Sequence, residues 1–142
     1  MNLSEDERKT IVALELEKSD GLFAQVSSLK ELGYWDTLAS RLYYAAFHAV
    51  PALLISDGYA ASTHKGAVAM LGLHYVKTGI LSEDDGSLYS QLQSLREKSD
   101  YNCYFAAGEK EVSKMIEPTK QLIDRISGII RTKSEGSCDR PQ

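Results

Sequence analysis

A cation, a phenol and an imidazole share one row of the segment from Ser40 to Leu54. Arg41, Tyr44 and His48 follow one another at three- and four-residue spacing, which places them on one side of an α-helix. Arginine is suited to bind phosphate, and histidine moves protons near neutral pH. Two helical turns, about 10.5 Å along the axis, separate Arg41 from His48, so both could contact one extended ligand but not one atom.

A second polar group lies in the segment from Leu95 to Tyr104. Arg96 and Asp100 are four residues apart, share a helix face and can pair. Arginine placed N-terminal to aspartate is the weaker orientation of such a pair, so helix stability alone explains it poorly. His64 and Lys65 begin another predicted helix, where backbone N–H groups attract anions.

Each of these groups also has a structural interpretation. Arg41 would pair with a carboxylate on a neighbouring helix and His48 would be a satisfied core histidine, because buried polar groups must be hydrogen-bonded or paired. Arg96 and Asp100 would form a solvent-exposed pair, and His64 would simply begin a capped helix. The sequence leaves both interpretations open.

Helices must position these residues, because helical periodicity dominates the chain and strand-like alternation is scarce. We expect helices over approximately residues 5–32, 36–56, 64–77, 83–104 and 109–131. Ser4 and Glu7 fit a capping box at the start of the first helix, and Ser19-Asp20-Gly21 is its weak point. Pro51 and Pro118 fall inside helices and are expected to kink them.

The helix over residues 36–56 is apolar around most of its girth, as is typical of the central helix of a bundle. We therefore predict an all-α fold, an up-and-down helical bundle of about five helices. One domain would span residues 1–131. The polar tail over residues 132–142 is expected to be disordered.

Composition narrows the classes of function. The chain of 142 residues has a formal net charge of −4, which argues against coating nucleic acid through bulk positive charge. No apolar run reaches the roughly 18 residues of a membrane span, and the acidic start is no secretory signal, so we expect a cytoplasmic protein. Cys103 and Cys138 form no CxxC pair and no H-E-x-x-H motif occurs, so we predict neither a metal site nor a cofactor.

Taken together, these features resemble the HEPN domains, specifically the small stand-alone group of bacteria and archaea. The resemblance covers roughly residues 5 to 130. The matching features, in order, are Gly33-Tyr34, SRLYYAAFHAV over residues 40–50, Ala52-Leu53-Leu54, Thr63-His64-Lys65-Gly66, and Arg96 followed by Asp100-Tyr101.

The resemblance implies a helical bundle that commonly dimerises. Many members of the family are metal-independent ribonucleases with an Arg-x4-6-His motif, and others sit beside a small nucleotidyltransferase as a toxin–antitoxin pair. In the nuclease members, Arg and His of two protomers meet in a cleft. Arg would hold the scissile phosphate there and His would move protons, while attack by the RNA 2′-hydroxyl removes the need for a metal.

The sequence departs from the nuclease pattern on the later helix. Tyr101 stands at the fifth position after Arg96, where Arg-x4-His would place a histidine. Tyrosine, with a reference pKa of about 10, is a poor general base at neutral pH. A literal Arg-x6-His match exists at Arg41 and His48 on the second predicted helix.

We therefore expect a nucleotide- or RNA-associated protein that forms a homodimer and is a toxin–antitoxin-type partner of a nucleotidyltransferase. The alternatives are a metal-independent ribonuclease acting as an RNA toxin, and a non-catalytic structural or interaction bundle. The predicted catalytic residues are Arg41, His48, Arg96, Asp100 and Tyr101, and the predicted nucleotide-binding residues are Tyr44, His64 and Lys65.

Overall fold

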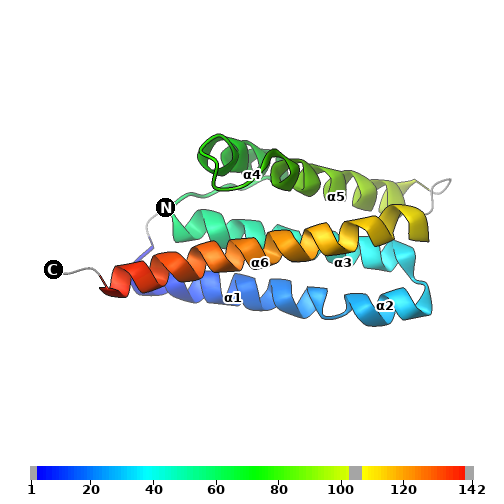
Figure 1. The fold of residues 1–142 in the computed structure, drawn as a ribbon, viewed down its shortest axis with the longest axis horizontal. Coiled ribbons are helices and arrows are strands. Elements are labelled where there is room, and N and C mark those ends of the chain that lie inside the picture. Colours follow the sequence, from blue (N-terminus) through cyan, green and yellow to red (C-terminus); the bar gives the residue numbers. More distant parts are fainter. Residues whose placement is uncertain (1–2, 103–106, 140–142) are drawn as a thin grey trace.

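The computed structural model describes residues 3–102 and 107–139, and its secondary structure there is entirely helical. This confirms the predicted all-α class. The elements in chain order are α1 (Glu5–Phe23), α2 (Val26–Leu32), α3 (Trp35–Ser56), α4 (His64–Leu71), the π-helical turn η1 (Gly72–Val76), α5 (Glu83–Tyr101) and α6 (Glu109–Asp139) (Figure 1).

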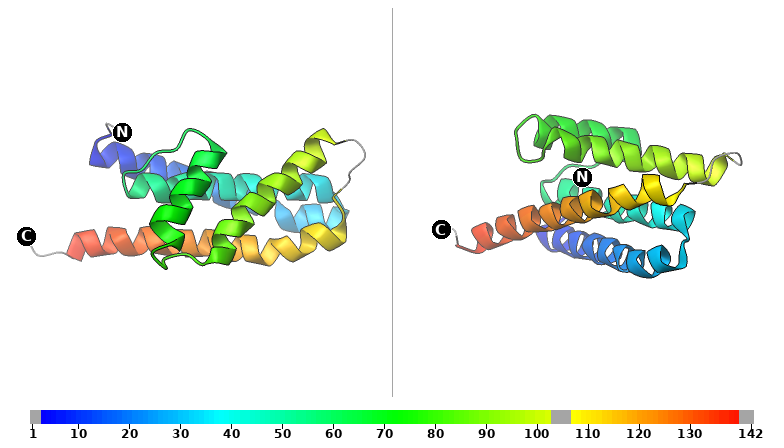
Figure 2. Two further views of the ribbon diagram at one scale, coloured as in Figure 1. Left: turned by 90° about the horizontal axis from the view of Figure 1, so that it is seen from above. Right: turned by 45° about the vertical axis from the view of Figure 1, so that its right-hand side comes forward.

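The centre of the fold is α3, as predicted. It packs against α1 and α2 on one side, α6 on another, and α4 and α5 on a third. The two views of Figure 2 show α4 and α5 as a layer that crosses over α3 and α6. Leu38, Leu42 and Leu53 are fully buried in this core. Burial of each leucine side chain contributes about 1.5–3 kcal/mol relative to exposure, and the alanines of α3 let its neighbours approach closely.

The first predicted helix is two helices, and the break does not lie at the predicted weak point. The Ser4–Glu7 capping box is present, and Gly33 ends α2 with φ 75°. The chain is interrupted at Ala24 and Gln25 instead of at Ser19-Asp20-Gly21. Ser19 is fully buried, and its hydroxyl donates to the Ala45 carbonyl at 2.7 Å. This bond fixes α1 to α3 where the sequence alone suggested a break.

One other element differs from the prediction. The third predicted helix is α4 followed by the π-helical turn η1, which ends at Val76. Both α3 and α6 continue through their prolines, Pro51 and Pro118, and the kink expected at each stays a prediction.

The tail expected to be disordered from Thr132 is helical as far as Asp139, so that prediction is wrong for residues 132–139. Thr132 donates to the Gly128 carbonyl at 2.8 Å, and the Lys133 ammonium contacts the Asp57 carboxylate at 2.5 Å. The second contact ties the end of α6 to the residue that ends α3. The last three residues, 140–142, and Cys103 lie outside the described part of the chain.

Among the described residues, α3 is long and apolar enough to cross a membrane, but 61% of its apolar window is buried inside the protein. A core helix has the same length and composition, so this is weak evidence for a span. Within the described ranges, no group of three His, Cys, Asp or Glu side chains is placed to hold a metal ion.

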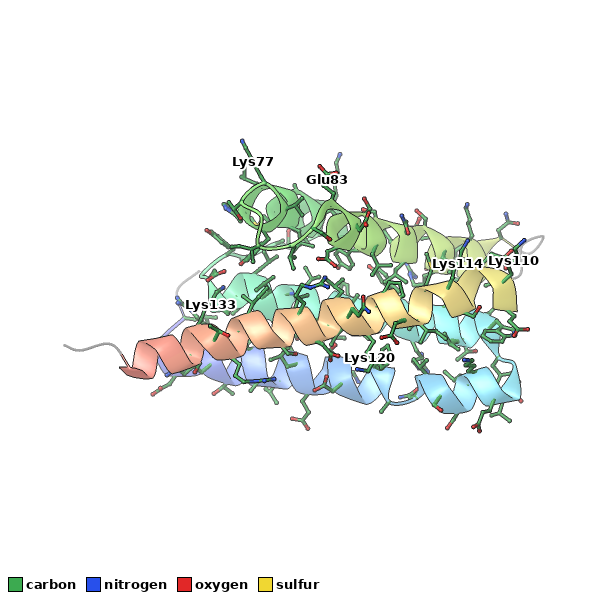
Figure 3. All side chains as sticks on the ribbon, in the orientation of Figure 1. Lys77, Glu83, Lys110, Lys114, Lys120 and Lys133 are labelled. Carbon is green, nitrogen blue, oxygen red and sulfur yellow. The ribbon has the colours of Figure 1, made fainter. Side chains whose placement is uncertain are left out.

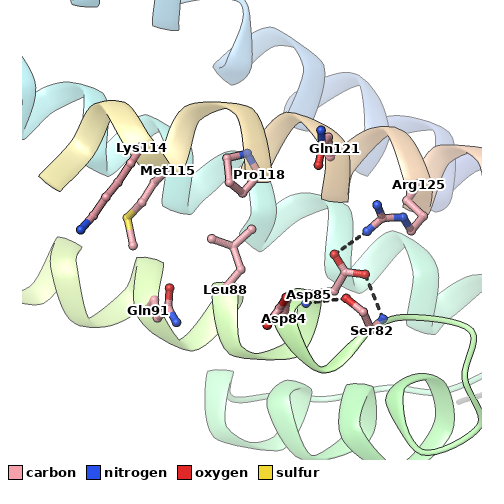
Figure 4. A pocket seen from close by; sticks show the side chains of 10 residues that line it. All are labelled: Ser82, Asp84, Asp85, Leu88, Gln91, Lys114, Met115, Pro118, Gln121 and Arg125. Atoms are coloured by element: carbon pink, nitrogen blue, oxygen red, sulfur yellow. Dashed lines mark hydrogen bonds and ion pairs between the residues drawn. The ribbon is translucent and has the colours of Figure 1, made fainter. Parts of the chain in front are cut away.

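The α5–α6 contact is organised by Asp85 (Figure 4). Its carboxylate accepts from the Ser82 backbone N–H at 3.0 Å, which completes a capping box, and from Arg125 of α6 at 2.5 Å. Leu88, Met115 and Pro118 line a cavity of about 490 Å³ beside this bond. Asp85 is 7% exposed, so its two partners replace water.

We expect Asp85→Ala to destabilise the protein by about 2 kcal/mol, because it removes the cap of α5 and leaves Arg125, which is partly exposed, without its carboxylate. Urea denaturation measures the loss. Asp84→Ala is the matched control, since it removes an exposed carboxylate from the same turn, and it should change stability by about 0.5 kcal/mol at most. An equal loss of stability in both variants would contradict the structural role of Asp85.

Candidate functional site

One row of α3 side chains escapes burial in the middle of the helix. The other residues between Leu42 and Val50 are buried, whereas Arg41, Tyr44 and His48 are partly exposed and Phe47 is 36% exposed. We call these four residues the α3 row. The structure thus places Arg41, Tyr44 and His48 on one side of the helix, as predicted. It also adds Phe47, an apolar residue that was not among the predicted members of this row.

Arg41 does not pair with a carboxylate. Its Nε donates to the side-chain oxygen of Gln25, at the start of α2, at 2.7 Å. Among the side chains described, those of residues 3–102 and 107–134, no carboxylate forms an ion pair with it, contrary to the structural interpretation. An amide oxygen orients the guanidinium without neutralising its charge. Its remaining N–H donors therefore suit an anionic ligand.

His48 lies against Glu15 of α1. The distance from its Nδ1 to the Glu15 Oε2 is 3.2 Å, and the two side chains are 23% and 28% exposed. A carboxylate at Nδ1 fixes the orientation of the ring and favours a proton on that nitrogen. This leaves Nε2 as the nitrogen that can exchange a proton with a ligand or with water.

Arg96 lies among three tyrosine rings. Its Cζ is 5.1 Å from the ring centroid of Tyr43, 5.6 Å from that of Tyr44 and 5.8 Å from that of Tyr101. Its Nη1 donates to Asp100 at 3.2 Å and to the Tyr44 hydroxyl at 3.5 Å. The predicted Arg96–Asp100 pair is therefore confirmed, but Arg96 is only 13% exposed. Stacking on aromatic faces stabilises a guanidinium that has lost most of its water.

Burial by itself would lower the pKa of Arg96, but the hydrogen bond to Tyr101 and the nearby Tyr44, Tyr101 and Asp100 raise it overall. The side chain therefore stays a cation. Its Nε is buried and has no hydrogen-bond partner. Tyr101 itself is 78% exposed at the end of α5.

His64 lies behind this cluster, against Tyr43 and Tyr89. Its ring centroid is 4.4 Å from that of Tyr89, and its Nδ1 is 3.3 Å from the Tyr43 hydroxyl. Burial lowers the pKa of His64, the charge of Glu97 opposes that change, and Arg96 reinforces it. A neutral imidazole can accept from the Tyr43 hydroxyl, so His64 is placed to support the cluster. Lys65, next in sequence, is exposed.

Phe47 joins the two predicted groups of residues. Its ring centroid is 5.3 Å from that of His48, 5.9 Å from that of Tyr43 and 6.0 Å from that of Tyr44. Tyr44 in turn contacts Arg96. We call the combined surface the α3–α5 face. Its members are Arg41, Tyr44, Phe47, His48, Arg96, Asp100 and Tyr101, and it brings together all five predicted catalytic residues and one of the predicted nucleotide-binding residues.

The α3–α5 face combines two cations, exposed rings and one histidine held by a carboxylate. Aromatic rings can stack on nucleobases, and guanidinium groups bind phosphate. Sequence reasoning missed Phe47, Tyr43, Glu15 and Gln25. The glutamate and the glutamine belong to distant segments, and no sequence signal connects them with α3.

The lowered pKa of His64 predicts how stability depends on pH. In the unfolded chain, His64 takes up a proton near its ordinary pKa of 6.5, whereas in the folded protein its pKa is lower. The free energy of unfolding therefore decreases as the pH falls below that value. We expect His64→Gln to lose less stability than the wild type between about pH 7.5 and pH 5.5. Urea midpoints at both pH values test this, and identical losses in the two proteins would contradict it.

Comparison with known proteins identifies the family. Residues 14–129 match the family model of the HEPN domain. A UPF0332 protein of Archaeoglobus fulgidus is 37% identical over 101 residues, which cover 71% of this chain and 76% of that protein. "Putative toxin MJ0605" of Methanocaldococcus jannaschii is 31% identical over 129 residues, 91% of this chain and 95% of that protein. The chain therefore belongs to the HEPN domain family, as its sequence motifs predicted.

Proposed function

We propose that this protein is a toxin-like HEPN protein that binds RNA or a nucleotide on the α3–α5 face. The relative from Methanocaldococcus jannaschii that bears the name of a toxin is similar along 91% of the chain, which supports the toxin-like assignment. A homodimer, a cytoplasmic location and a nucleotidyltransferase partner of the toxin–antitoxin type are parts of the same proposal. They rest on the known members of the family.

The observation that carries the proposal is Arg41, a cation oriented by Gln25 at 2.7 Å, on the same helix row as the exposed ring of Phe47. The protein has a formal net charge of −4, so an anionic polymer must be held by local cations. Arg41 would contact a phosphate, and unpaired bases would stack on Phe47 and Tyr101. Arg96, already bound to Asp100, would mainly hold the tyrosines in place.

A second candidate is a metal-independent ribonuclease, which the His48–Glu15 pair at 3.2 Å favours. The Nε2 of His48 would accept the proton of a 2′-hydroxyl, the 2′-oxygen would attack phosphorus, and the bond from phosphorus to the 5′-oxygen would break as that oxygen takes a proton from water. The products would be a 2′,3′-cyclic phosphate and a 5′-hydroxyl. About 10.5 Å along α3 separates Arg41 from His48, so both would act on one phosphate only across two protomers.

The binding proposal predicts that Arg41→Gln weakens the binding of a fluorescently labelled single-stranded RNA about tenfold, because a charge-assisted hydrogen bond is lost. Fluorescence anisotropy at low salt measures the dissociation constant. Lys120→Gln is the matched control. It removes the same charge from an exposed position on α6 (Figure 3) and should leave binding within about twofold. Equal weakening of RNA binding by both variants would show that the RNA responds only to the overall charge of the protein.

The ribonuclease candidate predicts cleavage of RNA in the presence of EDTA. His48→Ala should abolish it because the general base is lost, and Arg96→Ala should lower it by disordering the tyrosine cluster. Gel analysis of a labelled RNA reports cleavage, and circular dichroism checks that both variants fold. RNA binding without cleavage would support the binding proposal and contradict the ribonuclease candidate. An absence of both binding and cleavage would support the purely structural bundle.

A further inference from the structure

A second cavity lies at the C-terminal end of α3, apart from the α3–α5 face. It has a volume of about 420 Å³ and is formed by the first turns of α1, the end of α3 and the last part of α6. Arg8, Lys9 and Lys133 supply its basic groups, and Val12, Leu16 and Ile130 supply its apolar wall. Figure 3 labels Lys133 on the C-terminal part of α6.

Arg8 is the unusual residue of this cavity. It is partly buried, and its Nε is buried without a hydrogen-bond partner. Across the described parts of the chain, no ion pair reaches it either. A buried N–H without an acceptor raises the free energy of the folded state. An anion in the cavity would pair with the charge of the same guanidinium, which no carboxylate in the described parts of the chain balances.

The other two cations already have carboxylate partners. Lys9 lies 3.8 Å from Glu5, and Lys133 contacts Asp57 at 2.5 Å. The Asp57 carboxylate also accepts a hydrogen bond from the buried Tyr75 hydroxyl, which fixes its position. Lys133 is therefore held at the rim with its charge balanced by Asp57, and Arg8 is left as the cation of this cavity with no carboxylate partner among the described residues.

The apolar wall limits the kind of anion. Val12 is 7% exposed, and Leu16 and Ile130 are partly buried, so one side of the cavity offers aliphatic contacts. A volume of about 420 Å³ is within the range of small-molecule sites. A fully polar anion would make no contacts with this apolar side, and a neutral lipid would leave Arg8 without an anionic partner.

We propose that this cavity binds a small amphiphilic anion, a carboxylate or phosphate head group on a short aliphatic chain. The head group accepts hydrogen bonds from Arg8 beside Lys133, and the chain lies along Val12, Leu16 and Ile130. The site is independent of the proposed RNA-binding face.

Titration of the full chain with octanoate, monitored by ¹H–¹⁵N NMR, tests the proposal. Octanoate should shift the amide signals of residues around the cavity and saturate. Acetate and 1-octanol, which carry only the head or only the chain, should each bind at least about tenfold more weakly. Octyl phosphate distinguishes a preference for phosphate from one for carboxylate. Saturable binding of either amphiphile that is tighter than that of acetate and 1-octanol supports the site, and failure of both amphiphiles to bind more tightly than acetate overturns it.

Two variants locate the binding. Arg8→Gln should weaken octanoate binding about tenfold. Arg131→Gln, the same change at an exposed arginine of α6 near the cavity, is the matched control and should not. Ala13→Trp places a large ring at an exposed position in the cavity wall and should block the site without burying a new side chain in the core. Equal affinities in the wild type, Arg8→Gln and Ala13→Trp would overturn the assignment.

Discussion

The burial of α3 is the constraint on which the rest of the molecule depends. Three groups of helices surround it, and in its middle only the α3 row reaches the surface. Polar side chains on a buried helix need a partner or water. Arg41, Tyr44 and His48 therefore had to fall on the row that the neighbouring helices leave open. The same packing that stabilises the bundle concentrates its chemistry on one strip.

Three arginines show how differently the bundle treats buried or partly buried charge. Arg96 has Asp100 and three rings, Arg41 has only an amide oxygen, and Arg8 has no partner among the described residues. Pairing with a carboxylate lowers the cost of burial but also weakens the attraction for an anionic ligand. The charge available to a ligand thus rises from Arg96 to Arg41 and Arg8, which is the reason why Arg41 and Arg8 carry the two binding proposals.

The structural interpretation is right that His48 has a partner and that Arg96 pairs with Asp100, and it is wrong that Arg41 pairs with a carboxylate. His48 pairs with Glu15 and Arg96 pairs with Asp100, as an inert bundle would require. Neither pair is sealed from water, because Glu15 is 28% and Asp100 is 39% exposed. Pairing and function are compatible here, since a carboxylate that orients a histidine or an arginine also prepares it for a ligand.

The sequence by itself determined the all-α class, the family, the central position of α3, the Ser4–Glu7 cap and the common side of Arg41, Tyr44 and His48. The family follows from the resemblance of its motifs, and the other features follow from local periodicity and capping, which act within a few residues. Only the tertiary structure decided the break at Ala24, the helical end of α6, the exposure of Phe47 and the partners Gln25 and Glu15. Each of those depends on segments distant in sequence that meet across the bundle, and no local pattern encodes which side chains will face one another there.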